Sequence, residues 1–116
     1  MIRMHEVGII QETLNLALAQ AVKSGARQIH RIRMRVGAMS GVVPEALEFA
    51  FEVVRQGTMA AGARLEVDRV PASCWCAGCQ IEFESPDLLF ECPQCRQMGS
   101  ELRKGREIEL ASMEIS

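Results

Sequence analysis

The chain has 116 residues, a length that fits one domain, or one small domain carrying a smaller insert. The 13 Lys and Arg against 15 Asp and Glu leave a formal charge of −2, without the basic footprint of nucleic-acid binding. Apolar residues make up 48%, enough for a core, yet no run approaches the roughly 18 that a membrane span needs. Glu6, Gln11 and Glu12 interrupt any apolar leader, so five cysteines indicate a cytoplasmic metal protein rather than disulfides.

Two amphipathic helices are predicted. The first ends before Gly25, and its apolar residues recur at helical spacing: Val7, Ile10, Leu14, Ala17, Leu18 and Ala21. The second begins at Pro44, which suits a first helical turn because no N–H is needed there, and Gly57 closes the segment. Its predicted buried stripe consists of Ala46, Leu47, Ala50, Phe51 and Val54.

Three segments alternate between apolar and polar residues, the pattern of a half-buried strand: 28–36, 63–70 and 107–115. The arginines of the first segment share its outer face, where we expect solvated pairs with acids of neighbouring strands: Arg31, Arg33 and Arg35 with Glu66, Asp68 or Glu109. In the third segment the apolar parity switches between Leu110 and Met113. A β-bulge near Ala111 and Ser112 would keep both residues on one core face.

These elements predict an α+β fold, in which a small three-stranded sheet is covered on one face by two helices. Composition changes at Pro71, and little periodic apolar patterning follows until Lys104. We therefore expect an α/β domain formed by residues 1–70 plus 105–116, with a zinc-ribbon-like insert at residues 71–104 between its last two strands.

The insert contains two C-x-x-C pairs, Cys76 with Cys79 and Cys92 with Cys95, separated by twelve residues. A two-residue spacing lets both thiolates of one turn bind the same ion, and two such turns form a closed tetrahedral shell of four sulfurs. Zinc favours that shell, which leaves no open position for catalysis, so the pattern predicts a structural zinc site. An iron–sulfur centre is the remaining four-thiolate alternative, and the fifth cysteine, Cys74, is expected to be a spare thiol.

Met4-His5-Glu6 precedes the first predicted helix. An imidazole beside deprotonated backbone amide nitrogens is a donor set that square-planar Ni(II) or Cu(II) prefers, and such a site is open enough to release its ion. Taken alone the motif is weak, because a single histidine near a terminus is usually solvated. The other histidine, His30, lies at the start of a predicted strand and is interpreted as a partly buried structural residue rather than a fourth nickel donor.

Several motifs follow one another in the order of a known family. They are Met4-His5-Glu6, Val36-Gly37-Ala38-Met39-Ser40, Phe49-x-Phe51 with Gly57-Thr58, the two cysteine pairs, and the closing Gly105-Arg106-Glu107-Ile108-Glu109-Leu110 with Met113-Glu114-Ile115. Over nearly its whole length the chain resembles the HypA/HybF family of hydrogenase nickel-insertion accessory proteins, which are nickel metallochaperones.

The resemblance implies a protein that is not an enzyme and that carries Ni(II) to [NiFe]-hydrogenase, with urease as a second target in some members. It assigns transferable nickel to His5, with backbone nitrogens around His5 and Glu6 and a role for Glu6 in binding or selectivity. Structural zinc goes to the four paired cysteines, Cys76, Cys79, Cys92 and Cys95. The implied partners are a HypB-type GTPase, the hydrogenase large-subunit precursor and, in some members, urease accessory proteins; neither nucleic acid nor membrane is among them.

The chain departs from the family at its start, because Met1-Ile2-Arg3 precede the usual first methionine, Met4. If translation begins at Met4, its amine lies beside His5 and can bind nickel; if it begins at Met1, that nitrogen is an ordinary amide. The choice between monomer and homodimer and the enzyme that receives nickel are also left open. Two alternative functions remain, a zinc-ribbon module that recognises nucleic acid or a polymerase, and a redox enzyme using one C-x-x-C pair.

Overall fold

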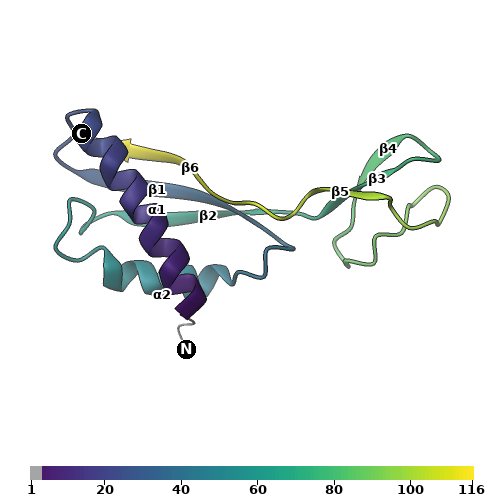
Figure 1. The fold of residues 1–116 in the computed structure, drawn as a ribbon, viewed down its shortest axis with the longest axis horizontal. Helices are drawn as coiled ribbons and strands as arrows, with labels where there is room; N and C mark the ends of the chain where they lie inside the picture. Colours follow the sequence, from purple (N-terminus) through teal and green to yellow (C-terminus); the bar gives the residue numbers. More distant parts are fainter. Residues whose placement is uncertain (1–3) are drawn as a thin grey trace.

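The computed structural model describes residues 4–116, which form an elongated molecule of 53 × 32 × 16 Å with a larger and a smaller part (Figure 1). The element order is α1 (Met4–Lys23), β1 (Ile29–Gly37), α2 (Pro44–Val54), β2 (Arg64–Val70), β3 (Ser73–Cys76), β4 (Ile81–Glu84), β5 (Glu101–Lys104) and β6 (Ile108–Ile115). Both predicted helices and all three predicted strands are therefore present. Within the described range, neither helix combines the length and apolar character needed to cross a bilayer.

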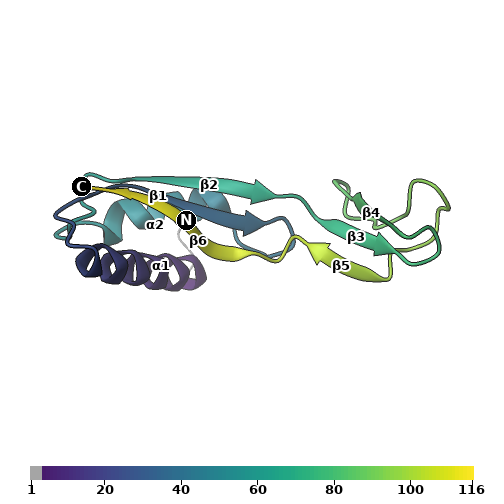
Figure 2. The ribbon, with the colours of Figure 1, turned by 90° about the horizontal axis from the view of Figure 1, so that it is seen from above.

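The larger part is a three-stranded sheet in the order β2-β1-β6, with β2 parallel and β6 antiparallel to β1. Between β2 and β6 the chain leaves this sheet and forms a second one, in the order β4-β3-β5 (Figure 2). The α+β fold with an inserted cysteine-bearing unit is confirmed, although the alternation pattern did not predict strands β3, β4 and β5. The domain boundaries at residues 71 and 104 stay a prediction.

The predicted bulge lies in β6. Ser112 is opposite Arg33 and Leu110 is opposite Met34, so Ala111 is the extra residue between two registered pairs. One additional residue restores the inward direction of the apolar side chains, as the parity switch required. Leu110 and Met113 accordingly both pack against the core.

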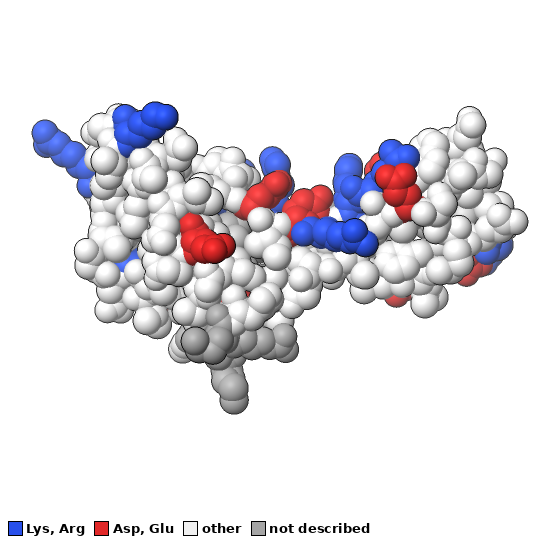
Figure 3. Space-filling model, in the orientation of Figure 1, with Lys and Arg blue, Asp and Glu red and all other residues white. Residues whose placement is uncertain are grey.

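The outer face of the larger sheet carries the expected ion pairs. Arg33 reaches Glu66 at 3.2 Å, and Arg35 reaches Glu109 at 3.3 Å. The hydrogen bond from Arg33 and the charges of Arg31 and Arg33 hold the pKa of Glu66 below its usual value. On the opposite, helix-bearing side, charged side chains are sparse over the middle of the larger part and gather at its upper left and near the junction with the smaller sheet (Figure 3).

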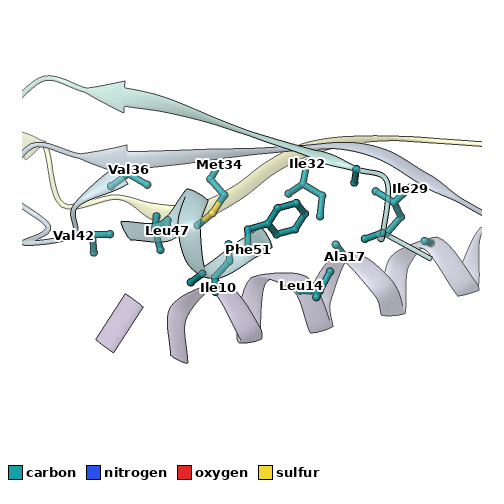
Figure 4. Close-up of a cluster of buried hydrophobic side chains, with 14 residues drawn as sticks. Ile10, Leu14, Ala17, Ile29, Ile32, Met34, Val36, Val42, Leu47 and Phe51 are labelled. Atoms are coloured by element: carbon teal, nitrogen blue, oxygen red, sulfur yellow. The ribbon is translucent and has the colours of Figure 1, made fainter. Parts of the chain in front are cut away.

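Both helices cover the inner face of the larger sheet, where the core forms (Figure 4). Ile10 and Leu14 of α1 face Met34 of β1, with Leu47 and Phe51 of α2 completing the cluster. In this view the step from Leu47 to Phe51 along α2 runs in the same direction as the step from Ile10 to Leu14 along α1. Both helices therefore begin at the same end of the core. The first turn of α1 therefore lies near the start of α2.

The two parts join where Gly37, at the end of β1, meets Gly105, just before β6. A Cβ at Gly37 would overlap the carbonyl group of Gly105, so only glycine allows the two backbones to approach this closely. The backbone N–H of Met39 donates to the Gly105 carbonyl oxygen at 2.6 Å, and the Gly105 N–H donates to the Glu107 side chain at 2.8 Å. This contact fixes the chain where it enters β6.

Gly37→Ala is expected to lower the free energy of unfolding by about 3 kcal/mol, because the added methyl group forces two backbones apart. Urea denaturation of the metal-loaded protein measures the change. Gly8→Ala is the matched control, since a Cβ at Gly8 meets nothing within 4 Å and the residue lies inside α1. That control should gain up to about 1 kcal/mol from helix propensity. Equal stability of Gly37→Ala and the wild type would contradict the close approach.

Candidate metal centres

The four paired cysteines come together at the far end of the smaller sheet. Cys76 ends β3, Cys79 lies in the turn that leads to β4, and Cys92 and Cys95 lie in the loop that follows β4. The Sγ atoms of Cys76 and Cys95 are 3.6 Å apart, those of Cys79 and Cys92 are 4.0 Å apart, and all four lie within 4.8 Å of one another. A tetrahedral ion with metal–sulfur bonds of about 2.3 Å separates its ligands by about 3.8 Å, so the cluster fits such an ion.

Each cysteine pair forms a turn of the same kind. Gln80 and Arg96, which follow the second cysteine of each pair, have φ angles of 54° and 66°. In the second turn the backbone N–H groups of Cys95 and Gln94 face the Cys92 sulfur and lower the pKa of its thiol to about 7. These N–H groups stabilise a thiolate, which is the form of cysteine that binds a metal.

The thiols also compete for protons. A hydrogen bond with the Cys95 thiol, together with burial, raises the pKa of Cys79 to about 12. Four sulfurs this close cannot all carry negative charge without a cation among them. A metal ion would supply that charge, and its uptake would release protons.

Cys74 lies outside this cluster. It is buried on β3 against Phe83 and Leu102, and burial raises the pKa of its thiol. All five cysteines are free, so the described chain has no disulfide that would compete with metal binding. Trp75 points to the opposite face of β3, where the Arg103 guanidinium lies 4.7 Å from its ring centre.

The N-terminal motif lies within the first helix, and the prediction that it precedes the helix is wrong. α1 begins at Met4, so His5 and Glu6 form its first turn. The first four N–H groups of a helix have no acceptor within the helix, so the amides of His5 and Glu6 can lose their protons to a metal without breaking a helical hydrogen bond. Whether translation begins at Met1 or at Met4 concerns residues 1–3, which lie outside the described residues.

His5 and Glu6 differ sharply in exposure although they are adjacent. The His5 side chain is 53% exposed, whereas the Glu6 side chain is 0% exposed. His5 Nδ1 lies 2.7 Å from Glu6 Oε2, while Oε1 of the same carboxylate is buried without a hydrogen-bond partner among the described residues. Burying a carboxylate is costly unless its negative charge is compensated, and a bound cation or the positive end of the helix dipole would compensate it here.

The spacing of these two atoms also suits a metal ion. First-row ions bind nitrogen and oxygen at about 2.0 Å, which puts two adjacent ligands at right angles about 2.8 Å apart. The 2.7 Å between His5 Nδ1 and Glu6 Oε2 matches that separation. Nδ1 is also the imidazole nitrogen that can form a chelate ring with the residue's own amide nitrogen, as the predicted donor set requires.

His30 is not brought to this motif. It lies near the start of β1, where its Nε2 is 2.7 Å from the Ser116 hydroxyl. That position follows the C-terminal end of α1, a helix of 20 residues and therefore about 30 Å long, whereas His5 lies in its first turn. The interpretation of His30 as a structural residue stays a prediction.

Comparisons with known proteins show which family the chain belongs to. Residues 4–115 match the family model described as "Hydrogenase/urease nickel incorporation, metallochaperone, hypA". The chain belongs to the HypA family. The hydrogenase maturation factor HypA of a Picosynechococcus species is 48% identical over 112 residues, covering 97% of this chain and 99% of that protein. The HypA of Chloroflexus aggregans is 38% identical over 96% of this chain and 98% of that protein.

Solved HypA structures share the fold. The solution structure of the Ni metallochaperone HypA from Helicobacter pylori superposes with a TM-score of 0.66 at 23% identity, covering 95% of this chain and 96% of that one. A second HypA solution structure gives a TM-score of 0.73 at 24% identity and covers 98% of both chains. The family consists of metallochaperones for nickel incorporation, not of enzymes. Its nickel-related role in hydrogenase maturation implies partner proteins.

Proposed function

We propose that this HypA-family chain binds Ni(II) at His5 and Glu6 and delivers it during maturation of [NiFe]-hydrogenase. The observation that carries the proposal is the 2.7 Å separation of an exposed imidazole nitrogen and a buried carboxylate oxygen. Nickel is the cargo, held by His5 Nδ1, Glu6 Oε2 and deprotonated backbone nitrogens of the first turn. Delivery to urease is a second proposed route, supported by the wording of the family description.

The second part of the proposal is a structural Zn(II) held by the four paired cysteines. A closed shell of four thiolates leaves no position for an exchangeable ligand, so its ion stays bound while the smaller sheet remains folded. The N-terminal site has an exposed imidazole on one side and can pass its ion to another protein. The soft thiolate ligands of one site and the harder nitrogen and oxygen ligands of the other thus favour different metals.

Delivery needs partners, for which we propose a HypB-type GTPase and the precursor of the hydrogenase large subunit. Nucleotide hydrolysis would be performed by the GTPase. The alternative functions, a nucleic-acid or polymerase module and a redox enzyme, gain no support from the metal geometry or from the family description.

The proposal is tested by calorimetric nickel titration of the zinc-loaded protein at pH 7 and pH 5.5. Nickel ligands must be deprotonated, so protons compete with the metal and affinity falls as pH falls. We expect the dissociation constant to rise at least about tenfold at the lower pH. Zinc content measured in both samples serves as the control. Equal nickel affinity at the two pH values, or no nickel binding at pH 7, would refute the proposed site.

A further inference from the structure

The outward side of α2 carries an exposed apolar stripe that the metal sites do not use. Phe49 is 61% exposed and Val53 is 58% exposed, and both lie on the same side of the helix as Ala46 and the preceding Val43. We call these four residues the α2 stripe. Exposed single apolar residues are ordinary, but a contiguous row that includes one of only four phenylalanines in the chain is not.

The stripe is separate from the core face of α2. With 100° per residue, Ala46, Phe49 and Val53 lie within about 60° of one another around the helix, beside the arc that buries Leu47 and Phe51. A shallow pocket lined by Val43, Glu45, Ala46 and Phe49 opens on this side. The stripe therefore has the shape and polarity of a docking surface.

An acidic row borders the stripe on its far side. Glu45, Glu48 and Glu52 share one arc of α2, and the helix contains no Lys, Arg or His. Arg69 reaches Glu45 at 2.7 Å and Arg55 reaches Glu52 at 2.6 Å. Exposed pairs of this kind contribute less than about 1 kcal/mol each, so an incoming cation can compete for the carboxylates.

The stripe begins near the proposed nickel site. α1 packs on α2, and Ile10 lies beside Leu47, one residue beyond Ala46 (Figure 4). His5 and Glu6 precede Ile10 by about one helical turn, roughly 7 Å along α1, toward the end at which α2 starts. A protein bound along the stripe would therefore come close to the imidazole that holds the cargo.

We propose that the α2 stripe docks a helix of a partner protein whose apolar face is flanked by Lys or Arg. A straight row over three turns matches the ridge of a second helix, and the acidic border selects cationic flanks. The same border repels anionic lipid headgroups and nucleic acid phosphates. The statement that a docked partner lies close to bound nickel rests on the proposed function. The docking of a helix on the α2 stripe does not.

The test uses the full zinc-loaded chain and a fluorescent synthetic peptide, an amphipathic helix with Leu on one face and Lys on its flanks. Fluorescence polarisation should detect binding that weakens as salt is raised. We expect Phe49→Asp to weaken binding at least about tenfold, as for an interface anchor, and Glu48→Lys to weaken it as well. A peptide with Glu in place of each Lys should bind at least about tenfold more weakly than the Lys peptide.

Leu16→Asp is the matched control, because Leu16 is 59% exposed on α1 and lies outside the stripe. It should leave peptide affinity unchanged, and thermal denaturation should show both Asp variants folded. Equal binding of the two peptides, or equal effects of Leu16→Asp and Phe49→Asp, would overturn the proposal. So would a dimer that Phe49→Asp dissociates, or binding to anionic phosphatidylserine vesicles that Phe49→Asp abolishes, because a second copy or a membrane would then be the occupant.

Nickel titration of the same samples separates the two proposals. Phe49→Asp should bind nickel as the wild type does, because the stripe contributes no nickel ligand. If the wild type binds the Lys peptide selectively but no nickel, the docking surface stands and the proposed function fails. If nickel binds normally while the peptide does not distinguish Phe49→Asp from the wild type, the docking surface is wrong and the nickel site stands.

Discussion

Cys92→Ser is expected to remove the metal from the four-cysteine cluster and to unfold the smaller sheet. Cys92 is fully buried, and its sulfur receives the N–H groups that lower its pKa. The buried hydrophobic core of this part consists of only four residues, Cys74, Cys76, Phe83 and Cys92, so two of its four members belong to the four-cysteine cluster. Zinc binding contributes about 10–16 kcal/mol to folding in comparable small zinc units, more than so small a core can supply.

Metal analysis of the purified variant measures the first effect, with zinc falling from one equivalent to near zero. Amide NMR measures the second, because resonances of β3, β4 and β5 should collapse while those of α1 and β1 persist. Cys74→Ala is the control, since Cys74 is also buried but lies outside the cluster. It should keep its zinc and lose about 1–2 kcal/mol of stability as a small core truncation. A Cys92→Ser protein with full zinc content would contradict the assignment.

Periodicity explains which parts of the fold the sequence could predict. Both helices have an apolar stripe over several turns, and β1 and β2 alternate for seven residues or more, so their local patterns are unambiguous. The bulge at Ala111 was predictable because the parity switch in 107–115 has only one economical solution. The cysteine cluster was predictable because two-residue spacing already determines the turn.

The strands of the smaller sheet carry no such pattern. β3, β4 and β5 have four residues each, and the inward residues of β3 are cysteines, which a pattern of large apolar residues does not detect. Their pairing depends on contacts far apart in sequence, such as Cys74 opposite both Phe83 and Leu102. The approach of Gly37 to Gly105 is equally non-local, and a glycine pair in a sequence does not show which backbones meet.

The burial of Glu6 was also beyond the sequence. An acidic residue in a first turn is normally exposed and favoured by the helix dipole, so the pattern predicts a solvated side chain. The apolar periodicity begins only at Val7, which placed the motif before the helix. With α1 beginning at Met4, Glu6 lies one helical turn before Ile10 on the buried side of α1, with its carboxylate 2.7 Å from His5 Nδ1.

His5→Ala is expected to abolish specific nickel binding while zinc and fold are kept. The substitution removes Nδ1, one of two side-chain atoms at ligand spacing, and also the only hydrogen-bond partner of the Glu6 carboxylate among the described residues. We expect nickel affinity to fall at least about 100-fold, as for loss of a metal ligand or its orienting partner. Because the buried Glu6 carboxylate then loses this hydrogen bond, the free energy of unfolding should fall by about 1–3 kcal/mol.

The measurement is nickel calorimetry beside urea denaturation and zinc analysis, with His30→Ala as the matched histidine control. His30 contacts Ser116 near the other end of α1, so its removal should leave nickel affinity unchanged. If His5→Ala binds nickel as tightly as the wild type, the cargo lies elsewhere in the chain. Equal loss of nickel in both variants would require one ion to bridge His5 and His30. These residues lie near opposite ends of α1, so one copy of the chain cannot hold an ion between them, and that outcome would contradict the assigned site.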